Sequence, residues 1–276
     1  MVIFSDATSD FQNSKFVILG IPFDGTSAYR PGARFAPNSI REASYNFESY
    51  LFEHDVNLQN IPIHDYGNLE EFGDVKQMVN SVEKKFEDFG EKMPIVMGGE
   101  HSITYPIIKS IAKKIDIEVV FMDAHLDFRN EYLGLKESHA CTVRRVSEVV
   151  GLDNIVLIGI RSMSNDEKND AIAFGLKYIT ADEVKKNGME EILNRVLKQN
   201  KKKLYLSLDI DCIDPSYAPG TGTPEPFGIT PDDVKKAINL LGKKLVGFDI
   251  VEICPPYDNG NTSILGARLI REVIGV

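Results

Sequence analysis

Six side chains of types that commonly bind divalent metals lie in three short segments of the sequence. Each segment directly follows an apolar run, and the six residues are His101, Asp123, His125, Asp127, Asp209 and Asp211. In an extended chain, side chains at positions i, i+2 and i+4 point to the same face. The Asp-Ala-His-Leu-Asp segment at 123–127 therefore predicts three convergent ligands, and the Asp-Ile-Asp segment at 209–211 predicts two more.

Four of these six side chains are carboxylates, and their charge predicts what they bind. Like charges held close together cannot all stay ionised without a counter-charge, which two divalent cations would supply. Oxygen-rich sites with two imidazoles and no thiolate favour manganese over iron, cobalt or zinc. Two such ions lower the pKa of a bound water and make hydroxide available near neutral pH. We therefore expect a dinuclear metal centre.

Two more residues could complete a catalytic site. His139 follows the first cluster by twelve residues, on an expected loop over the site, and an imidazole there suits general acid or base catalysis. A solvated loop histidine is the alternative. Glu252 ends another apolar run, where a carboxylate could hold a cationic substrate or form a buried salt bridge. His54 and His64 have no partners at metal-binding spacing, and we expect structural or surface roles for them.

The elements that must position these residues alternate along the whole chain. Apolar, β-branched runs typical of strands buried on both faces cover 16–21, 94–98, 117–124, 154–160, 176–180, 203–210 and 244–251, with a weaker run around 61–66. Helical spacing of apolar residues covers 74–89, 102–114, 189–198 and 231–241. This alternation predicts a mostly parallel sheet with helices on both faces and a site at the carboxyl ends of the strands.

Loops and helix ends add further expectations. The Gly/Pro-rich stretches 20–37 and 219–228 are expected to be rigid loops that wall a pocket. Arg30 and Arg34 could line that pocket, contact another subunit or form internal salt bridges. Asp214 is expected to hold its loop or to support a metal ligand, rather than to bind metal itself. Thr230 precedes Pro231 and two aspartates, which predicts a capped helix start.

Composition excludes several classes of protein. The 276 residues carry 31 Lys and Arg against 41 Asp and Glu, a net charge of −10, which argues against a nucleic-acid partner. No apolar run is long enough to span a bilayer, and the first residues do not resemble a signal peptide. The three widely spaced cysteines suit reduced thiols in a cytoplasmic protein.

Taken together, the motifs resemble those of the ureohydrolase family, which contains arginases and agmatinases. The matching segments are GGEHS (98–102), DAHLD (123–127), SHA (138–140), SLDIDCIDP (207–215), GTGTPEP (220–226) and the VE at 251–252. The resemblance covers essentially the whole chain, so we expect one domain over residues 1–276. It implies a three-layer α/β/α fold with an eight-stranded, mostly parallel sheet.

The resemblance also implies a ligand set for two Mn²⁺ ions. One ion would be held by His101, Asp123, Asp127 and Asp209, and the other by His125, Asp123, Asp209 and Asp211. No ligand is substituted, which argues against a regulatory or structural relative without activity. The presence of His101 and Asp127 argues against a zinc deacylase, a class that usually uses one metal with fewer ligands.

Within that family the segment 127–145 looks like that of agmatinases. Arginases carry an Asn-containing segment here that binds the α-carboxylate of the substrate, and no equivalent Ser-Gly-Asn run precedes His139. We therefore expect hydrolysis of agmatine to putrescine and urea by a hydroxide that bridges the metals and is oriented by Asp127. Glu252 would hold the guanidinium and His139 would supply or relay a proton. Guanidinobutyrase, arginase or formiminoglutamase activity remains the alternative, and homo-oligomers, trimers or hexamers, are usual in the family.

Overall fold

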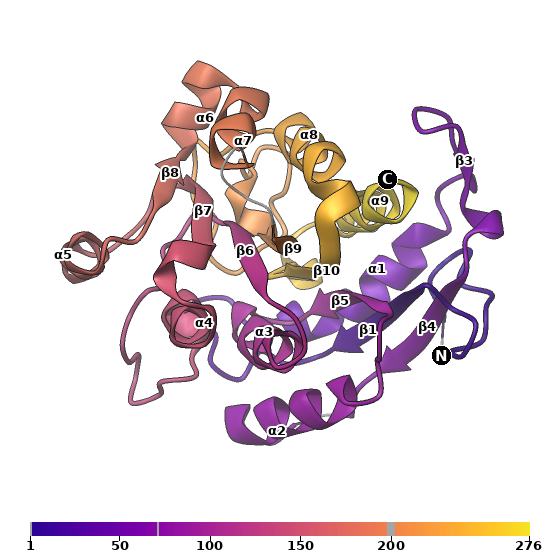
Figure 1. Ribbon diagram of the computed structural model, residues 1–276, viewed down its shortest axis with the longest axis horizontal. Helices are drawn as coiled ribbons and strands as arrows, with labels where there is room; N and C mark the ends of the chain where they lie inside the picture. Colours follow the sequence, from indigo (N-terminus) through magenta and orange to yellow (C-terminus); the bar gives the residue numbers. More distant parts are fainter. Residues whose placement is uncertain (1, 71, 198–201) are drawn as a thin grey trace.

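Eight strands form one continuous parallel sheet at the centre of the computed structural model, which describes residues 2–70, 72–197 and 202–276 (Figure 1). The strand order is β4-β1-β5-β10-β9-β6-β7-β8. Their bounds are β1 (Phe16–Ile21), β4 (Ile63–Asn68), β5 (Met93–Gly98), β6 (Ile117–Met122), β7 (Ile155–Ile160), β8 (Tyr178–Thr180), β9 (Lys203–Asp209) and β10 (Leu245–Val251). All eight predicted strands, including the weak one, are confirmed.

Helices cover both faces of this sheet, as predicted. One layer contains α2 (Val75–Phe86), α3 (Thr104–Ala112) and α4 (Thr142–Val150) (Figure 1). The other contains α1 (Ala36–Ser44), α6 (Ala181–Asn187), α7 (Met189–Leu197), α8 (Pro231–Leu241) and α9 (Asn261–Gly275). Neighbouring strand residues serve opposite layers, because Ile18 and Leu19 are fully buried in separate apolar clusters. The fold is therefore the three-layer, arginase-like α/β/α arrangement.

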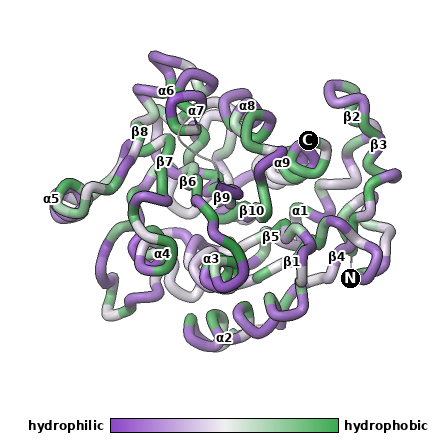
Figure 2. Tube along the Cα trace, viewed as in Figure 1, coloured by the Kyte–Doolittle hydropathy of each residue, from purple (hydrophilic) through white to green (hydrophobic). Residues whose placement is uncertain are grey.

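The amphipathic helices pack as their apolar spacing predicts. In α2, Met78 and Val82 are buried on one side, and Figure 2 shows the alternation of hydrophobic and hydrophilic residues along this helix. Helix α8 begins with the predicted cap, because the Thr230 hydroxyl accepts the Asp233 backbone N–H while the Asp233 carboxylate accepts the N–H of Thr230. None of the described helices is both long enough and apolar enough to cross a lipid bilayer.

Several elements differ from the expectation. The helices α1, α4, α5 (Asn165–Phe174), α6 and α9, and a short hairpin of β2 (Tyr50–Leu51) and β3 (Val56–Asn57), were not predicted. Helix α1 starts inside the stretch 20–37 that was expected to be a loop, where Pro37 takes a first-turn position that tolerates a missing N–H. The last residue of the predicted helix 189–198 lies outside the described residues.

Candidate metal and substrate site

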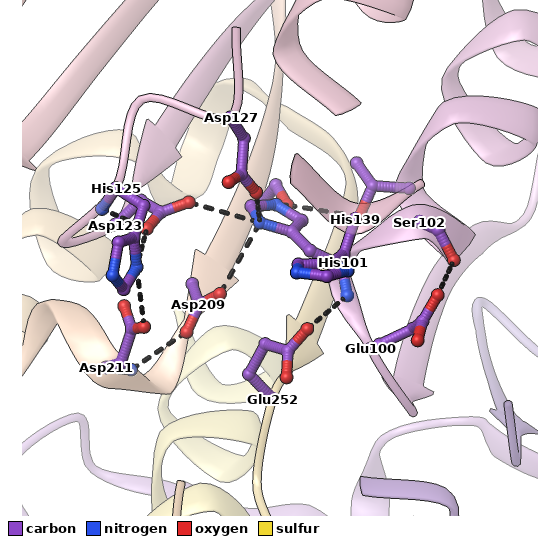
Figure 3. Close-up of polar contacts among 12 residues, drawn as sticks. Glu100, His101, Ser102, Asp123, His125, Asp127, His139, Asp209, Asp211 and Glu252 are labelled. Carbon is purple, nitrogen blue, oxygen red and sulfur yellow. Dashed lines mark hydrogen bonds and ion pairs between the residues drawn. The ribbon is translucent and has the colours of Figure 1, made fainter. Parts of the chain in front are cut away.

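The predicted ligands meet where four neighbouring central strands end. In the order β5-β10-β9-β6, the chain continues into His101 shortly after β5, into Glu252 directly after β10 and into Asp123 directly after β6, while Asp209 is the last residue of β9. Figure 3 shows these side chains pointing toward one another, together with the remaining predicted ligands. The strand order therefore joins residues that are about 150 positions apart in the chain.

Two groups of ligand atoms share Asp123. The Nδ1 atom of His101 lies 3.1 Å from Asp123 Oδ2, 3.1 Å from Asp127 Oδ2 and 3.4 Å from Asp209 Oδ2. The Nδ1 atom of His125 lies 3.0 Å from Asp211 Oδ2 and 3.7 Å from Asp123 Oδ1. His101 with Asp123 and Asp209, and His125 with Asp123 and Asp211, each have the composition and spacing that could hold a metal ion.

The ligands converge through turns, and the expectation of an extended chain was wrong in detail. Strand β6 ends at Met122, and Asp127 has φ of 46°, in the left-handed region that is strained for a non-glycine residue. Asp211 lies in a 3₁₀ turn, and its N–H donates to Asp209 Oδ1 at 2.9 Å. Such turns redirect side chains that strict alternation would send elsewhere.

A buried hydroxyl relay orients His101. Its Nε2–H donates to Ser207 Oγ at 3.1 Å, and the Ser207 hydroxyl donates to Asp249 Oδ1 at 2.7 Å. The other Asp249 oxygen accepts the hydroxyls of Tyr205 at 2.7 Å and Thr104 at 3.0 Å. With the proton on Nε2, the Nδ1 lone pair faces the carboxylates. A polar partner on the second ring nitrogen is the usual support for a metal-binding histidine.

The ionised carboxylates of the cluster repel one another and need positive charge nearby to stay ionised. Burial raises the pKa of Asp209 well above its ordinary value, and the charges of Asp211 and Asp123 raise it further. Burial and the Asp123 charge likewise raise the pKa of Asp127 to about 7. Burial by itself would lower the pKa of His101, but its three carboxylate neighbours outweigh that effect and raise it. Without a cation, the cluster must therefore take up protons.

Two buried atoms of the cluster have no hydrogen-bond partner in the part of the chain that the structure describes. They are His101 Nδ1 and Asp123 Oδ2, which face each other at 3.1 Å. Buried polar atoms rarely stay unsatisfied without a bound water, an ion or a functional reason. The cluster therefore suits a pair of divalent cations. It offers nitrogen and oxygen atoms as metal ligands, it carries negative charge, and two of its buried lone pairs are unused.

Glu252 lies beside the cluster and lines its cavity. It is 8 % exposed, and its Oε1 accepts the backbone N–H of His101 at 2.7 Å. Burial raises the pKa of its carboxyl well above the ordinary value, and the charge of Glu100 adds to this. Within the described ranges, no lysine or arginine forms an ion pair with Glu252, although Arg30 lines the same recess.

His139 also lines this cavity, whose volume is about 190 Å³. It begins a 3₁₀ turn (His139–Cys141) rather than lying in an open loop, and it is mostly shielded from solvent. Burial, followed by the charges of His101 and His125, lowers the pKa of His139 to about 4. The imidazole is therefore neutral near neutral pH.

The sequence interpretation missed residues at the mouth of the cavity. Arg129 and Glu167 line it and form an ion pair of 3.1 Å, and the Arg129 guanidinium lies over the ring of Tyr132. The signal available for Arg129 was its position two residues after Asp127. The sequence gives no signal for Glu167, because this residue caps a helix far along the chain.

The residues expected to be structural form hydrogen bonds or ion pairs away from the metal cluster. His54 Nε2 lies 2.7 Å from Glu272, and His64 Nδ1 lies 2.9 Å from the backbone oxygen of Ser9. Asp214 holds its loop by accepting the N–H groups of Ser216 and Gly228. Arg34 pairs with Asp24, which is the internal salt bridge considered above. All three cysteines are buried and free.

An arginase-like α/β/α fold with an acidic, histidine-containing cluster at the strand ends defines a hydrolase of the ureohydrolase class. Comparison with known proteins agrees with this assignment. The model of the Arginase family matches residues 14–275, and the chain belongs to the arginase family. It is an agmatinase-like hydrolase of this family.

Three similar proteins illustrate the relationship. The crystal structure of agmatine ureohydrolase of Thermoplasma volcanium has a TM-score of 0.94 and 43 % identity, covering 100 % of this chain and 94 % of that one. The agmatinase of Pyrococcus horikoshii is 35 % identical, covering 98 % of this chain and 94 % of its own. The N(1)-aminopropylagmatine ureohydrolase of Thermococcus kodakarensis is 35 % identical, covering 96 % and 91 %. The predicted family resemblance is confirmed.

Proposed function

We propose that this enzyme hydrolyses agmatine to putrescine and urea with two Mn²⁺ ions, as a cytoplasmic homo-oligomer. The observation that carries the proposal is the convergence of four carboxylates and two imidazoles beside Glu252, a buried carboxylate that forms no ion pair with a described residue. Relatives named for agmatine hydrolysis at 35 % and 43 % identity support the choice of substrate.

The proposed metal ligands are the six residues of the cluster. His101, Asp123, Asp127 and Asp209 would hold one ion, and His125, Asp123, Asp209 and Asp211 the other, with Asp123 and Asp209 shared. Oxygen donors with two imidazoles favour manganese. When bound, the two ions would make hydroxide available as a nucleophile near neutral pH and stabilise negative charge in the transition state.

Three residues of the chain would handle the substrate and the protons. The Glu252 carboxylate would accept charge-assisted hydrogen bonds from the guanidinium, and Asp127 would accept one from the attacking water. Water adds to the guanidinium carbon and the bond to the alkyl nitrogen breaks. Both protons of the water end on the departing nitrogen, which leaves as an ammonium, and the carbon leaves as urea. Because the pKa of His139 is lowered to about 4, we propose that its neutral ring takes a proton from the reacting water and hands it to the amine.

The charges at the cavity mouth favour a substrate without a carboxylate. Arg129 is the one arginine or lysine among the described residues that line this cavity, and its charge is already paired with Glu167. Arg30 lines the adjoining recess, together with Glu252 and His139. A guanidino acid such as guanidinobutyrate would need a free cation in the main cavity, whereas the tail ammonium of agmatine would not. Within the main cavity this favours agmatine, and guanidinobutyrase, arginase or formiminoglutamase-type activity remains the alternative.

A comparison of substrates tests the proposal. We expect urea release with Mn²⁺ to be faster from agmatine than from arginine or guanidinobutyrate. If agmatine fails while another guanidino compound works, the proposed substrate is wrong although the family assignment stands.

A second experiment tests the metal ligands. Asp209→Ala should abolish metal loading and activity together, whereas Asp153→Asn, with a side chain 98 % exposed, should retain both. Full activity of a metal-free Asp209→Ala protein would refute the proposed role of the cluster.

A further inference from the structure

Glu100 is a buried carboxylate that the metal cluster does not use. It is 0 % exposed and lies between Gly99 and the metal-ligand candidate His101. Its two oxygens accept four hydrogen bonds, from the Thr26 hydroxyl at 2.5 Å, the Ser102 hydroxyl at 2.7 Å, the Thr26 N–H at 2.8 Å and the Ser27 hydroxyl at 3.2 Å. Four donors use the acceptor positions of an ionised carboxylate. Such a complete set of hydrogen bonds indicates that Glu100 fixes the position of the groups that donate to it.

The group that Glu100 holds is the hydroxyl of Thr26. This hydroxyl gives its single proton to Glu100, so its oxygen can only accept further hydrogen bonds. Both remaining bonds go to His139, whose backbone N–H lies 3.0 Å from Thr26 Oγ1 and whose Nδ1 lies 3.1 Å from it. The Ser138 hydroxyl also faces Nδ1, but at 3.4 Å it is farther than the Thr26 oxygen, so the shorter contact places the proton on Nδ1 in the neutral ring. The lone pair is left on Nε2, the nitrogen that Thr26 does not engage.

Neighbouring strands hold the two partners rigidly. Thr26 lies in the loop after β1, and Glu100 lies in the turn after β5, the strand paired with β1. The Glu100 N–H donates to the Phe23 backbone oxygen at 2.7 Å, and the Gly99 N–H donates to Ile21 at 3.0 Å. A Cβ at Gly99 would stand 1.8 Å from the Phe23 oxygen, so only glycine permits this approach. The loop is thereby locked against the turn that carries Glu100.

We propose that Glu100 and Thr26 are positioning residues that fix the tautomer and ring orientation of His139 for proton transfer. The assignment rests on the proposed function in so far as His139 relays a proton there. A histidine works as a base only when the nitrogen aimed at the reacting group is unprotonated, and a hydrogen bond at the other nitrogen decides this. The chain from Glu100 through Thr26 to Nδ1 acts as the carboxylate does in a Ser-His-Asp triad, with a hydroxyl inserted.

Three substitutions separate the hydroxyl's role from simple packing. Thr26→Val keeps the shape and the backbone bond to Glu100 but removes the hydroxyl, and Thr26→Ser restores it. Ser102→Ala is the matched control, because its hydroxyl contacts the same Glu100 oxygen without contacting His139. We expect Thr26→Val to lower kcat by about 10–100-fold, the scale on which groups that orient a functional histidine act, with unchanged metal content and KM. We expect Thr26→Ser to recover most of the rate, and Ser102→Ala to lose much less.

Neutron diffraction from deuterated crystals of the metal-loaded protein gives a readout independent of turnover. We expect a deuteron on Nδ1 of His139 in the wild-type protein and in Ser102→Ala. A deuteron on Nε2 instead would overturn the inference whatever the substrate is. Equal kcat for Thr26→Val and wild type would also overturn it, as would a Thr26→Ser variant as slow as Thr26→Val. A failure of the agmatine proposal alone would leave the tautomer result standing.

Discussion

The metal-free enzyme should become less stable as the pH rises from about 5.5 to about 7, and metal should cancel the effect. The cause is the acidic cluster, in which burial and neighbouring charge raise the pKa of Asp127 from 3.8 to about 7. A carboxyl whose pKa is raised in the folded state stabilises the fold when it is protonated. That stability is fully present below the unfolded pKa and is lost as the pH rises through the folded value.

The magnitude follows from this shift. In the interval between the two pKa values, the free energy of unfolding falls by about 1.4 kcal/mol per pH unit for each proton. From about pH 5.5 to about 7, Asp127 alone therefore removes about 2 kcal/mol, or a Tm decrease of about 4–8 °C for a domain of this size. His101 and His125 act in the same direction above their ordinary pKa, because their folded pKa values are raised as well. His139 acts in the opposite direction, because its folded pKa is lowered to about 4, and the raised pKa values of His101 and His125 offset its effect. A net decrease of about 2 kcal/mol is therefore expected.

Scanning calorimetry over this pH range, after removal of metal with EDTA, measures the effect. Asp127→Asn removes one titrating group and should flatten the dependence, whereas the exposed Asp153→Asn should leave it unchanged. Excess Mn²⁺ should raise Tm most at the higher pH, because metal binds to deprotonated ligands. A metal-free Tm that is flat or rises over this interval would refute the electrostatic reasoning, as would an equal slope in Asp127→Asn.

Three further predictions concern single residues of the site. Glu252→Gln should lower kcat/KM by roughly 10–100-fold in steady-state assays, because a charged hydrogen bond contributes about 1.5–3 kcal/mol, and an unchanged value would remove Glu252 from substrate binding. His139→Asn should keep its metals by elemental analysis yet lose at least ~100-fold in rate; an unaltered rate would show that the proton passes elsewhere. Gly99→Ala should lower the free energy of unfolding in urea by about 1–3 kcal/mol through its clash with Phe23, whereas Gly73→Ala, which meets only the flexible end of Gln77, should change it little.

Much of the fold could be predicted because its information is local. Strands buried on both faces must be apolar throughout, so runs such as Phe16–Ile21 and Lys203–Asp209 stand out by composition. Helix α8 is equally visible, because its cap and first-turn proline are adjacent in sequence. Helix α5 has an apolar pattern too weak to notice, and its cap at Ser164 and Glu167 was not used in the prediction.

The candidate ligands were visible for the same reason, since Asp and His directly after apolar runs are chemically distinctive. The distances between these side chains could not be predicted from the sequence. Only the strand order brings His101, Asp123 and Asp209 within hydrogen-bonding range, and only local turns such as the left-handed Asp127 aim them at one point.

The sequence by itself therefore determined the strands, the parallel α/β class and the residue types that can bind metal, because periodicity and composition act over a few neighbouring positions. Tertiary structure alone decided which groups support them. Ser207 and Asp249 stand in register on paired strands, and Thr26 reaches His139 across 113 positions. Such contacts depend on how loops and strands pack in space, and no local pattern of residues encodes that packing.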